Sequence, residues 1–258
     1  WTEIVSNTDN LYIWQDTVKE LIIDNKQVTG VKTLLGVEMK AKCVVLTAGT
    51  FLRGLIHVGK MQIDGGRVSE PASYGLTEQL KSIGFTTDRM KTGTPMRIDG
   101  RTIDFSQLTE QVGENDFHKF SYLKEVKREL PQQSCWITYT NQKTHEILHG
   151  GLEFSPLYNG QIKSIGPRYC PSIETKIITF ADKNAHQLFL EPEGVNSREW
   201  YVNGFSSSLP WQTQIAAIQS VKGLEKVQLY RPGYAIEYDF FDPTQLNHSL
   251  ETKRIKNL

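Results

Sequence analysis

Short apolar runs near the start of the chain alternate with turn-forming residues. Residues 18–23 (VKELII) predict a strand, residues 24–27 (DNKQ) predict a turn, and residues 28–35 predict a second strand that runs on to Gly36. We expect a third strand after Gly36. The pattern therefore predicts a small antiparallel meander.

A continuous apolar run follows at residues 43–46 (CVVL) and is typical of a strand that is buried on both faces. The run ends at four small residues, Thr47, Ala48, Gly49 and Thr50. Small residues at the end of a buried strand let a ligand approach the backbone, as at dinucleotide sites. A tight structural turn would show the same residues, so both interpretations stay open.

Helical spacing appears in the next segment. Leu76, Leu80 and Ile83 lie on one face of a predicted helix, and Gly84 is its expected stop. Ser73 precedes this helix. We expect its hydroxyl either to cap the helix or to bind a phosphate at the helix N-terminus.

From residue 91 onward the pattern becomes irregular and polar, with short β-like pieces such as residues 135–139 (CWITY). This change predicts an inserted α+β domain. Pro210 favours the start of a helix whose apolar stripe, expected to pack in the core, is Trp211, Ile215, Ile218 and Val221. Residues 227–230 and 235–238 predict strands that return to the first unit.

Composition restricts the class of protein. The sequence has 258 residues, of which 38% are hydrophobic and 22% charged, so it can bury a sizeable core. Lys and Arg together number 29, as do Asp and Glu, and any contact with nucleic acid must therefore come from a local patch. We find no signal peptide and no apolar run approaching about 18 residues. A cytoplasmic protein without a membrane association is expected.

Two kinds of site are disfavoured by the motifs. The three cysteines, Cys43, Cys135 and Cys170, are far apart and show no CxxC or His-rich spacing, which argues against a disulfide framework and against a metal site. Residues 54–60 satisfy GxxxxGK, but Met61 follows where a phosphate-binding loop needs a hydroxyl for Mg²⁺. We therefore do not expect nucleoside triphosphate hydrolysis.

The segment richest in candidate chemistry is residues 165–174 (IGPRYCPSIE). Its two prolines predict a rigid, non-helical platform. The cation of Arg168 would favour the thiolate of Cys170, which is the form that attacks electrophiles. A buried, inert cysteine is an equally good interpretation. Arg168 either lowers the pKa of the thiol, binds a phosphate or forms a salt bridge with Glu174. Tyr169 either stacks on a base or a flavin ring or packs within the protein.

Several segments together resemble the GidA/MnmG family of tRNA uridine 5-carboxymethylaminomethyl modification enzymes. The resemblance covers nearly the whole chain. It rests on six ordered runs, at residues 47–52 (TAGTFL), 91–95 (KTGTP), 98–105 (IDGRTIDF), 166–174 (GPRYCPSIE), 189–194 (FLEPEG) and 231–239 (RPGYAIEYD).

The resemblance implies an α/β fold: part of a Rossmann-like FAD-binding domain of the glutathione-reductase type, with an inserted α+β domain. It implies that residues 1–92 belong to the FAD-binding domain, residues 93–228 to the inserted nicotinamide and substrate domain, and residues 229–258 to the return. The chain begins without Met and lacks the family's FAD pyrophosphate loop and C-terminal helical domain. We therefore expect a central fragment, inactive by itself.

The activity implied by the resemblance is the addition of an aminomethyl or carboxymethylaminomethyl group to C5 of the wobble uridine in tRNA. FAD would mediate the redox step, NADH would reduce the flavin, and methylene-tetrahydrofolate would donate the one-carbon unit. The implied partner is a tRNA-modification GTPase, which forms a heterotetramer with a homodimer of this protein.

Site residues follow from the same matches. Cys170 matches a catalytic cysteine. Val18 and Ser73 match FAD-contacting positions and join the small residues Thr47, Ala48 and Gly49. The stretch assigned to nicotinamide-nucleotide binding is Gly166, Pro167, Arg168, Tyr169, Cys170, Pro171, Ser172, Ile173, Glu174, Thr175, Lys176, Ile177, Ile178, Thr179 and Phe180.

Three alternatives remain at this point. The chain also resembles the folate- and FAD-dependent tRNA uridine C5-methyltransferase, although the runs around Cys170 and at residues 231–239 favour the first family. The fragment could instead be a catalytically inert module that contributes structural or tRNA contacts.

A further set of cations either forms a basic track for tRNA phosphates or is solvated surface: Lys91, Arg97, Arg101, Lys163 and Arg168.

Overall fold

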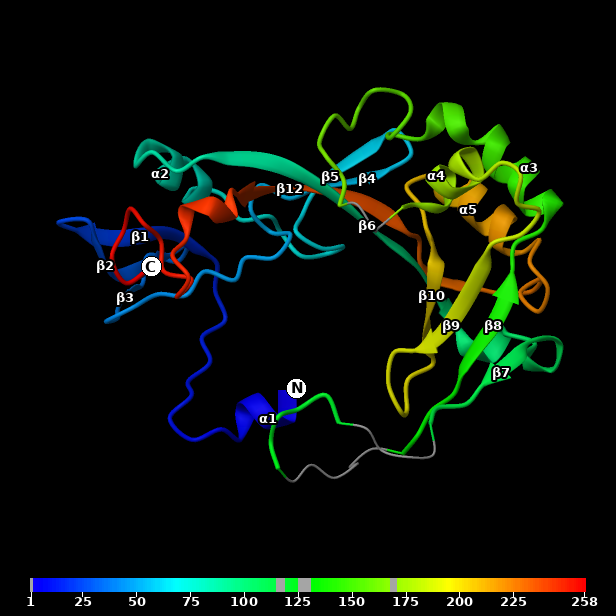
Figure 1. The fold of residues 1–258 in the computed structure, drawn as a ribbon, viewed down its shortest axis with the longest axis horizontal. Coiled ribbons are helices and arrows are strands. Elements are labelled where there is room, and N and C mark those ends of the chain that lie inside the picture. Colours follow the sequence, from blue (N-terminus) through cyan, green and yellow to red (C-terminus); the bar gives the residue numbers. More distant parts are fainter. Residues whose placement is uncertain (1, 115–118, 125–130, 168–170) are drawn as a thin grey trace. The chain divides into compact units, whose positions relative to one another are not determined.

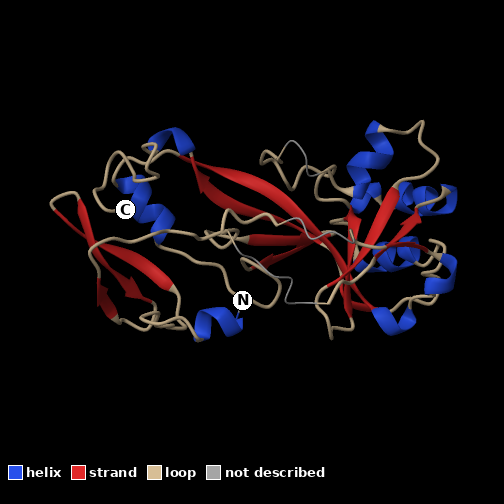
Figure 2. Ribbon diagram, turned by 60° about the horizontal axis from the view of Figure 1, so that its bottom comes forward, coloured by secondary structure: helices blue, strands red, loops and turns tan. Residues whose placement is uncertain are grey.

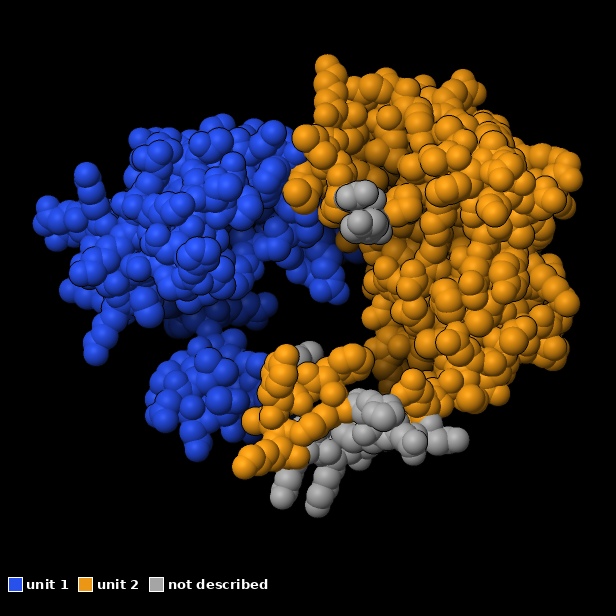
Figure 3. Space-filling model, in the orientation of Figure 1, with its two compact units in different colours: residues 1–54, 64–89, 238–258 blue, residues 55–63, 90–237 orange. Residues whose placement is uncertain are grey.

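The computed structural model describes residues 2–114, 119–124, 131–167 and 171–258, and the chain divides into two compact units (Figure 3). Unit 1 comprises residues 1–54, 64–89 and 238–258, and unit 2 comprises residues 55–63 and 90–237. Two of the crossings between units fall inside strands β6 (Thr87–Asp99) and β12 (Tyr234–Phe241). The predicted assignment of FAD and nicotinamide functions to separate domains stays a prediction.

Unit 1 contains a three-stranded antiparallel sheet, formed in chain order by β1 (Val18–Asp24), β2 (Gln27–Thr33) and β3 (Glu38–Lys40) (Figure 1). Asp24 pairs with Gln27, and between them Asn25 and Lys26 have φ angles of 47° and 63°. A two-residue turn with positive φ at both positions matches the right-handed twist of the flanking strands, and Asn adopts this conformation readily. The predicted meander is confirmed.

The described part of unit 1 contains two helices, α1 (Thr2–Ser6) and α2 (Leu76–Ser82), and a 3₁₀ turn at Pro243–Gln245. Gly84, with a φ of 99°, follows α2 as predicted. Leu76 and Leu80 are buried in the core of unit 1, whose other buried members are Leu21, Val28, Leu52, Phe85 and Ile255. Helical spacing thus identified the correct apolar face.

The prediction of a buried strand at residues 43–46 is wrong. The structure has no strand there, Cys43 is exposed, and Val45 is 81% exposed. A strand buried on both faces needs neighbouring strands on both edges. Among the described residues, Val44 donates its N–H to the Asn257 carbonyl at 3.0 Å, and no strand lies alongside.

Unit 2 is built on a nine-stranded sheet, whose order is β5-β4-β12-β6-β10-β9-β8-β7, with β11 also paired to β6. Beyond β6 and β12, its strands are β4 (Leu55–Val58), β5 (Met61–Asp64), β7 (Thr109–Gln111), β8 (Cys135–Tyr139), β9 (Gln187–Pro192), β10 (Glu199–Ser206) and β11 (Leu229–Arg231). β4 and β5 are joined at Gly59, whose φ is 55°. The GxxxxGK residues therefore form a strand and a turn rather than a phosphate-binding loop.

The KTGTP run, predicted to be irregular, lies within the 13-residue strand β6. Pro95 cannot donate to a ladder, and strands usually accommodate proline at a bulge or an edge. Here Pro95 lies opposite Ser206, and the β10–β6 register shifts between Tyr201 and Ser206. The irregularity of the sequence thus marks a bulge within a long strand.

Short helices lie around the strands of unit 2 (Figure 2): α3 (Gln142–Gly150), α4 (Ile173–Thr179) and α5 (Trp211–Ile218), with 3₁₀ turns at Gly100–Thr102, Phe105–Gln107 and Leu152–Phe154. α3 contacts both α4 and α5, and α4 contacts β10. The fully buried core residues include Met96, Ile98, Leu188, Val202 and Phe205. The α/β class with a large sheet agrees with the prediction. None of the described helices is long and apolar enough to cross a membrane.

The apolar stripe of α5 is only partly core. Ile218 and Val221 are fully buried, as predicted, but Trp211 is 51% exposed and Ile215 is partly buried. Periodicity identifies the apolar face of a helix but does not show how far neighbouring elements cover it. The first turn of α5 therefore borders a surface groove.

Candidate functional site

Ser73 connects two parts of unit 1 that the sequence predicted to bind a cofactor. Its hydroxyl donates to the Val18 carbonyl at 3.2 Å, and its backbone N–H donates to the Phe51 carbonyl at 2.8 Å. The expected capping role is wrong, because Gly75 is the N-cap of α2 and the Glu78 side chain accepts from its N–H. Val18 and Ser73 are thus brought together with the turn that follows the small residues.

The small residues at 47–50 form a tight turn. The Phe51 N–H donates to the Ala48 carbonyl at 3.0 Å, and Gly49 has a φ of 54°. No heavy atom lies within 4 Å of the position that a Cβ would take on Gly49. The interpretation as a turn is therefore confirmed, and the backbone at Gly49 faces open space, while the binding of a ligand there stays a prediction.

A charged cluster in unit 1 surrounds the buried carboxylate of Asp239. The Arg89 guanidinium donates to Asp239 Oδ1 at 2.8 Å and to the Arg53 carbonyl at 3.1 Å, and Arg53 Nη1 lies 3.7 Å from Asp239 Oδ2. Tyr74 donates to Asp64 at 2.9 Å, and this hydrogen bond raises the pKa of the phenol. None of these roles was predicted from the sequence, since each pairs residues from distant segments.

In unit 2, two of the sequence runs and the segment at the end of β10 meet at close contacts that glycine permits. A Cβ on Gly93 would lie 2.5 Å from Ser206 Oγ, and a Cβ on Gly233 would lie 2.8 Å from the Thr94 carbonyl and 3.0 Å from the Ser207 carbonyl. Residues 91–95, 206–208 and 231–234 are therefore packed directly against one another. We call this region the motif junction.

A fully buried glutamine joins two segments of the motif junction. Gln214 Oε1 accepts the Gly233 N–H at 2.8 Å, while Gln214 Nε2 donates to the Gly233 carbonyl at 2.9 Å and to the Leu209 carbonyl at 2.7 Å. Its amide thus satisfies backbone groups that would otherwise be buried without partners.

Glu174 is the buried anion of the junction. It is 0% exposed, and its Oε1 accepts from Ser208 N at 2.8 Å and from the hydroxyls of Ser207 and Ser208 at 3.2 Å each. Its Oε2 has no hydrogen-bond partner among the described residues. The carboxylate also lies in the first turn of α4, where the helix dipole favours negative charge. Glu174 therefore ties α4 to the segment after β10.

A second buried polar group joins β4 to β12. His57 Nε2 lies 2.8 Å from Glu237 Oε2, and Ser164 Oγ donates to Glu237 Oε1 at 2.7 Å. His57 is 0% exposed and Glu237 is 7% exposed. Sequence reasoning missed this group, because His57 appeared only within the rejected GxxxxGK pattern. Ser164 immediately precedes residues 165–174, the segment predicted to be catalytic. The carbonyl of Ile165, the first residue of that segment, accepts the Lys91 N–H at 2.9 Å.

The predicted nicotinamide stretch divides into described and undescribed parts. Arg168, Tyr169 and Cys170 lie outside the described residues. Ser172 caps α4 by accepting from the Thr175 N–H, and the fully or almost fully buried positions on this helix are Ile173, Glu174 and Ile177. These described residues have structural partners, and their proposed role in binding a nucleotide is untested.

The predicted basic track is mostly engaged elsewhere. Arg97 pairs with Glu193 and lies 4.2 Å from the Tyr201 ring centroid. Arg101 pairs with Asp99 and holds the pKa of that carboxyl at about 2. Lys91 is buried and Lys163 is exposed. Among the described residues, no group of three or more His, Cys, Asp or Glu side chains is arranged to hold a metal ion.

Comparison with known proteins accounts for the whole chain. The family model described as "Glucose inhibited division protein A" (GIDA) matches residues 1–258. The chain belongs to the GidA family. It is 65% identical over 258 residues to the "tRNA uridine 5-carboxymethylaminomethyl modification enzyme MnmG" of Parabacteroides distasonis and 63% identical to that of Porphyromonas gingivalis. Each of these alignments covers 100% of this chain but only 41% of the relative.

A solved structure supports the fold of this GidA-family chain. Aquifex aeolicus GidA in its form I crystal matches with a TM-score of 0.88 and 51% sequence identity, over 99% of this chain and 44% of that one. The form II crystal gives a TM-score of 0.87. The resemblance inferred from six sequence runs is therefore confirmed, and so is the fold class.

Proposed function

We propose that this GidA-family chain is part of an enzyme that adds an aminomethyl or carboxymethylaminomethyl group to C5 of the wobble uridine in tRNA. The observation that supports the proposal most strongly is the sequence identity. Over all 258 residues the chain is more than 60% identical to two relatives that are named for this modification. The same name favours this activity over the methyl transfer considered from the sequence. Because the chain spans 41% of those relatives, the proposal concerns the natural protein at its full length.

FAD is the proposed cofactor, and the residues of unit 1 fit part of such a site. The Gly49 turn faces open space, so a ligand can approach its backbone, and Ser73 fixes the end of β1 beside the same segment. Thr47, Ala48, Gly49, Val18 and Ser73 would hold the cofactor. When bound, FAD supplies the two-electron redox step.

The remaining parts of the reaction are also proposals. NADH would serve as the reductant, methylene-tetrahydrofolate as the one-carbon donor and a GTPase as the partner of a homodimer in the cytoplasm. Addition of the Cys170 thiolate to C6 of uridine would make C5 nucleophilic, and the cation of Arg168, two positions earlier in the sequence, would favour the thiolate. Loss of the C5 proton to a base and departure of the thiolate from C6 would restore the C5–C6 double bond after C5 has been substituted.

The test of the catalytic assignment is Cys170→Ser in the natural gene, expressed in a bacterial strain that lacks its own enzyme of this family. Mass spectrometry of tRNA nucleosides should show loss of the C5-modified wobble uridine. Cys135→Ser is the matched control, since Cys135 lies in β8 and burial raises the pKa of its thiol, which makes it a poor nucleophile. Wild-type modification by Cys170→Ser would refute the role of this thiol.

A further inference from the structure

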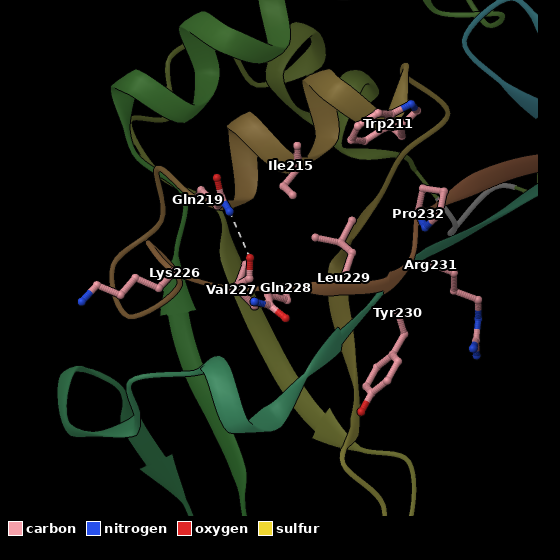
Figure 4. Close-up of a pocket in the computed structure, with 10 residues that line it drawn as sticks. All are labelled: Trp211, Ile215, Gln219, Lys226, Val227, Gln228, Leu229, Tyr230, Arg231 and Pro232. Atoms are coloured by element: carbon pink, nitrogen blue, oxygen red, sulfur yellow. Dashed lines mark hydrogen bonds between the residues drawn. The ribbon is translucent and has the colours of Figure 1, made fainter.

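A surface groove of about 440 Å³ lies in unit 2 between α5 and the segment that ends in β11 (Figure 4). Ile215 on the helix and Leu229 on the strand point toward one another across it. Gln219 closes one side by donating from Nε2 to the Val227 carbonyl at 3.0 Å. The floor of the groove is thus apolar and held by a defined hydrogen bond.

Two aromatic side chains border the groove and remain accessible. Trp211 is 51% exposed at the start of α5, and Tyr230 is 47% exposed on β11. Large aromatic rings that stay accessible at the edge of a cavity are typical of binding sites, because a ligand can bury them at small entropic cost. Gln228, which also lines the groove, is exposed.

The charge of the lining selects the kind of ligand. Lys226 and Arg231 extend from opposite ends of the groove, and none of the described residues that line it is Asp or Glu (Figure 4). Carboxylates do lie near both cations. Arg231 forms an ion pair with Glu199. The pKa of Asp104 is lowered by hydrogen bonds from Ser106 and Gln107 and, to a smaller extent, by the positive charge of Lys226. Glu199 also pairs with Arg97, whose Nε lies 3.8 Å from Glu199 Oε1. Its negative charge therefore neutralises the charge of Arg231 only in part.

We infer that this groove binds an unpaired nucleotide of the tRNA substrate, with the base against Trp211 or Tyr230 and the phosphate near Lys226. Aromatic rings stack on any base, cations attract the phosphate, and an exposed amide can bond a base edge. The inference rests on the proposed function for its choice of RNA. It adds a binding surface on unit 2 that includes Trp211 and Ile215, which sequence periodicity had assigned to the core.

The experiment measures binding of an unmodified tRNA transcript with uridine at the wobble position to the natural full-length protein and its variants. Trp211→Ala and Tyr230→Ala should each weaken binding by about 5- to 100-fold, whereas Tyr230→Phe should keep most of the affinity. Tyr139→Ala is the matched control, because Tyr139 is 51% exposed in unit 2 but does not line the groove. Its affinity should equal that of the wild type.

Salt dependence tests the phosphate contact separately. Lys226→Gln should reduce the slope of log affinity against log salt by about 0.7 to 1, the value of one phosphate contact. Lys143→Gln, an exposed lysine on α3, should leave the slope unchanged. As a measurement that needs no variant, photo-cross-linking of a 4-thiouridine transcript to the wild-type protein should label the peptides that contain residues 211–232.

The outcomes separate the two proposals. If the wild type modifies and binds tRNA while both alanine variants bind like Tyr139→Ala and no cross-link falls at residues 211–232, the groove inference is overturned and the proposed function stands. If the alanine variants bind tRNA normally but elute at a smaller size than the wild type, the groove is an interface between copies of the protein, which also overturns the inference. If the wild type binds no tRNA, both proposals fail.

Discussion

Removal of the Glu174 side chain should destabilise unit 2, because a backbone amide would lose its partner. In Glu174→Ala, the Ser208 N–H stays buried without its acceptor at 2.8 Å. An unsatisfied buried donor costs about 1 to 3 kcal/mol, and the loss of one buried methylene group, Cγ, adds about 0.8 kcal/mol. The hydroxyls of Ser207 and Ser208 can rotate to other acceptors, so they add little.

One contribution opposes this loss. Glu174 Oε2 is buried without a partner among the described residues, and removing a poorly compensated carboxylate relieves part of its desolvation cost. The net loss of unfolding free energy should therefore be about 1 to 3 kcal/mol. Glu174→Gln keeps an oxygen in the Oε1 position and all the methylene groups, so it should lose less, about 0 to 2 kcal/mol.

Urea unfolding followed by circular dichroism measures the global effect, and hydrogen exchange of the peptide that contains Ser208 measures the local one. Two units need not unfold in a single step, so the local measurement is decisive. Glu153→Ala makes the same change at an exposed position and should alter stability by less than about 0.5 kcal/mol. If exchange at Ser208 and the unfolding free energy of Glu174→Ala match those of Glu153→Ala, the account of this carboxylate is refuted.

Two further predictions concern pH and flavin. His145 and His186 have ring centroids 5.3 Å apart, and burial, aided by neighbouring cations, lowers the pKa of both rings. The unfolded chain therefore binds these protons more readily, and stability should fall as pH drops below the ordinary imidazole pKa. Thermal melts from about pH 8 to about pH 5 should show a smaller loss in the double variant His145→Gln/His186→Gln, and an unchanged loss would contradict the assignment. The 258-residue chain alone, mixed with FAD and gel-filtered, should elute without flavin absorbance, because its sequence contains no pyrophosphate-binding loop; a retained yellow flavin would disprove this.

Local signals predicted the parts of the fold that depend on local chemistry. The meander follows from alternating apolar runs around Asn25 and Lys26, and α2 follows from apolar spacing with Gly84 at its end. Such signals do not report whether a partner is present. The apolar run at residues 43–46 has the composition of a buried strand but lacks neighbouring strands among the described residues.

The polar groups of the candidate site could not be read from the sequence for a related reason. His57 and Glu237 are 180 positions apart, and Ser208 follows Glu174 by 34 positions. Neither pair has a spacing rule, because the topology of the sheet brings each pair together. The glycines of the motif junction carried a weaker signal: Gly93 and Gly233 stand where a Cβ would collide with a neighbouring segment, yet the sequence alone did not show which segment.

Mass spectrometry of wobble nucleosides tests the central proposal most directly. The natural gene in full should be expressed in a strain that lacks its own enzyme of the GidA family, beside the gene of the Parabacteroides distasonis relative as a positive control. We predict that both genes restore uridine carrying an aminomethyl or carboxymethylaminomethyl group at C5. Restoration by the relative with unmodified uridine in the strain that carries this gene would contradict the proposed function.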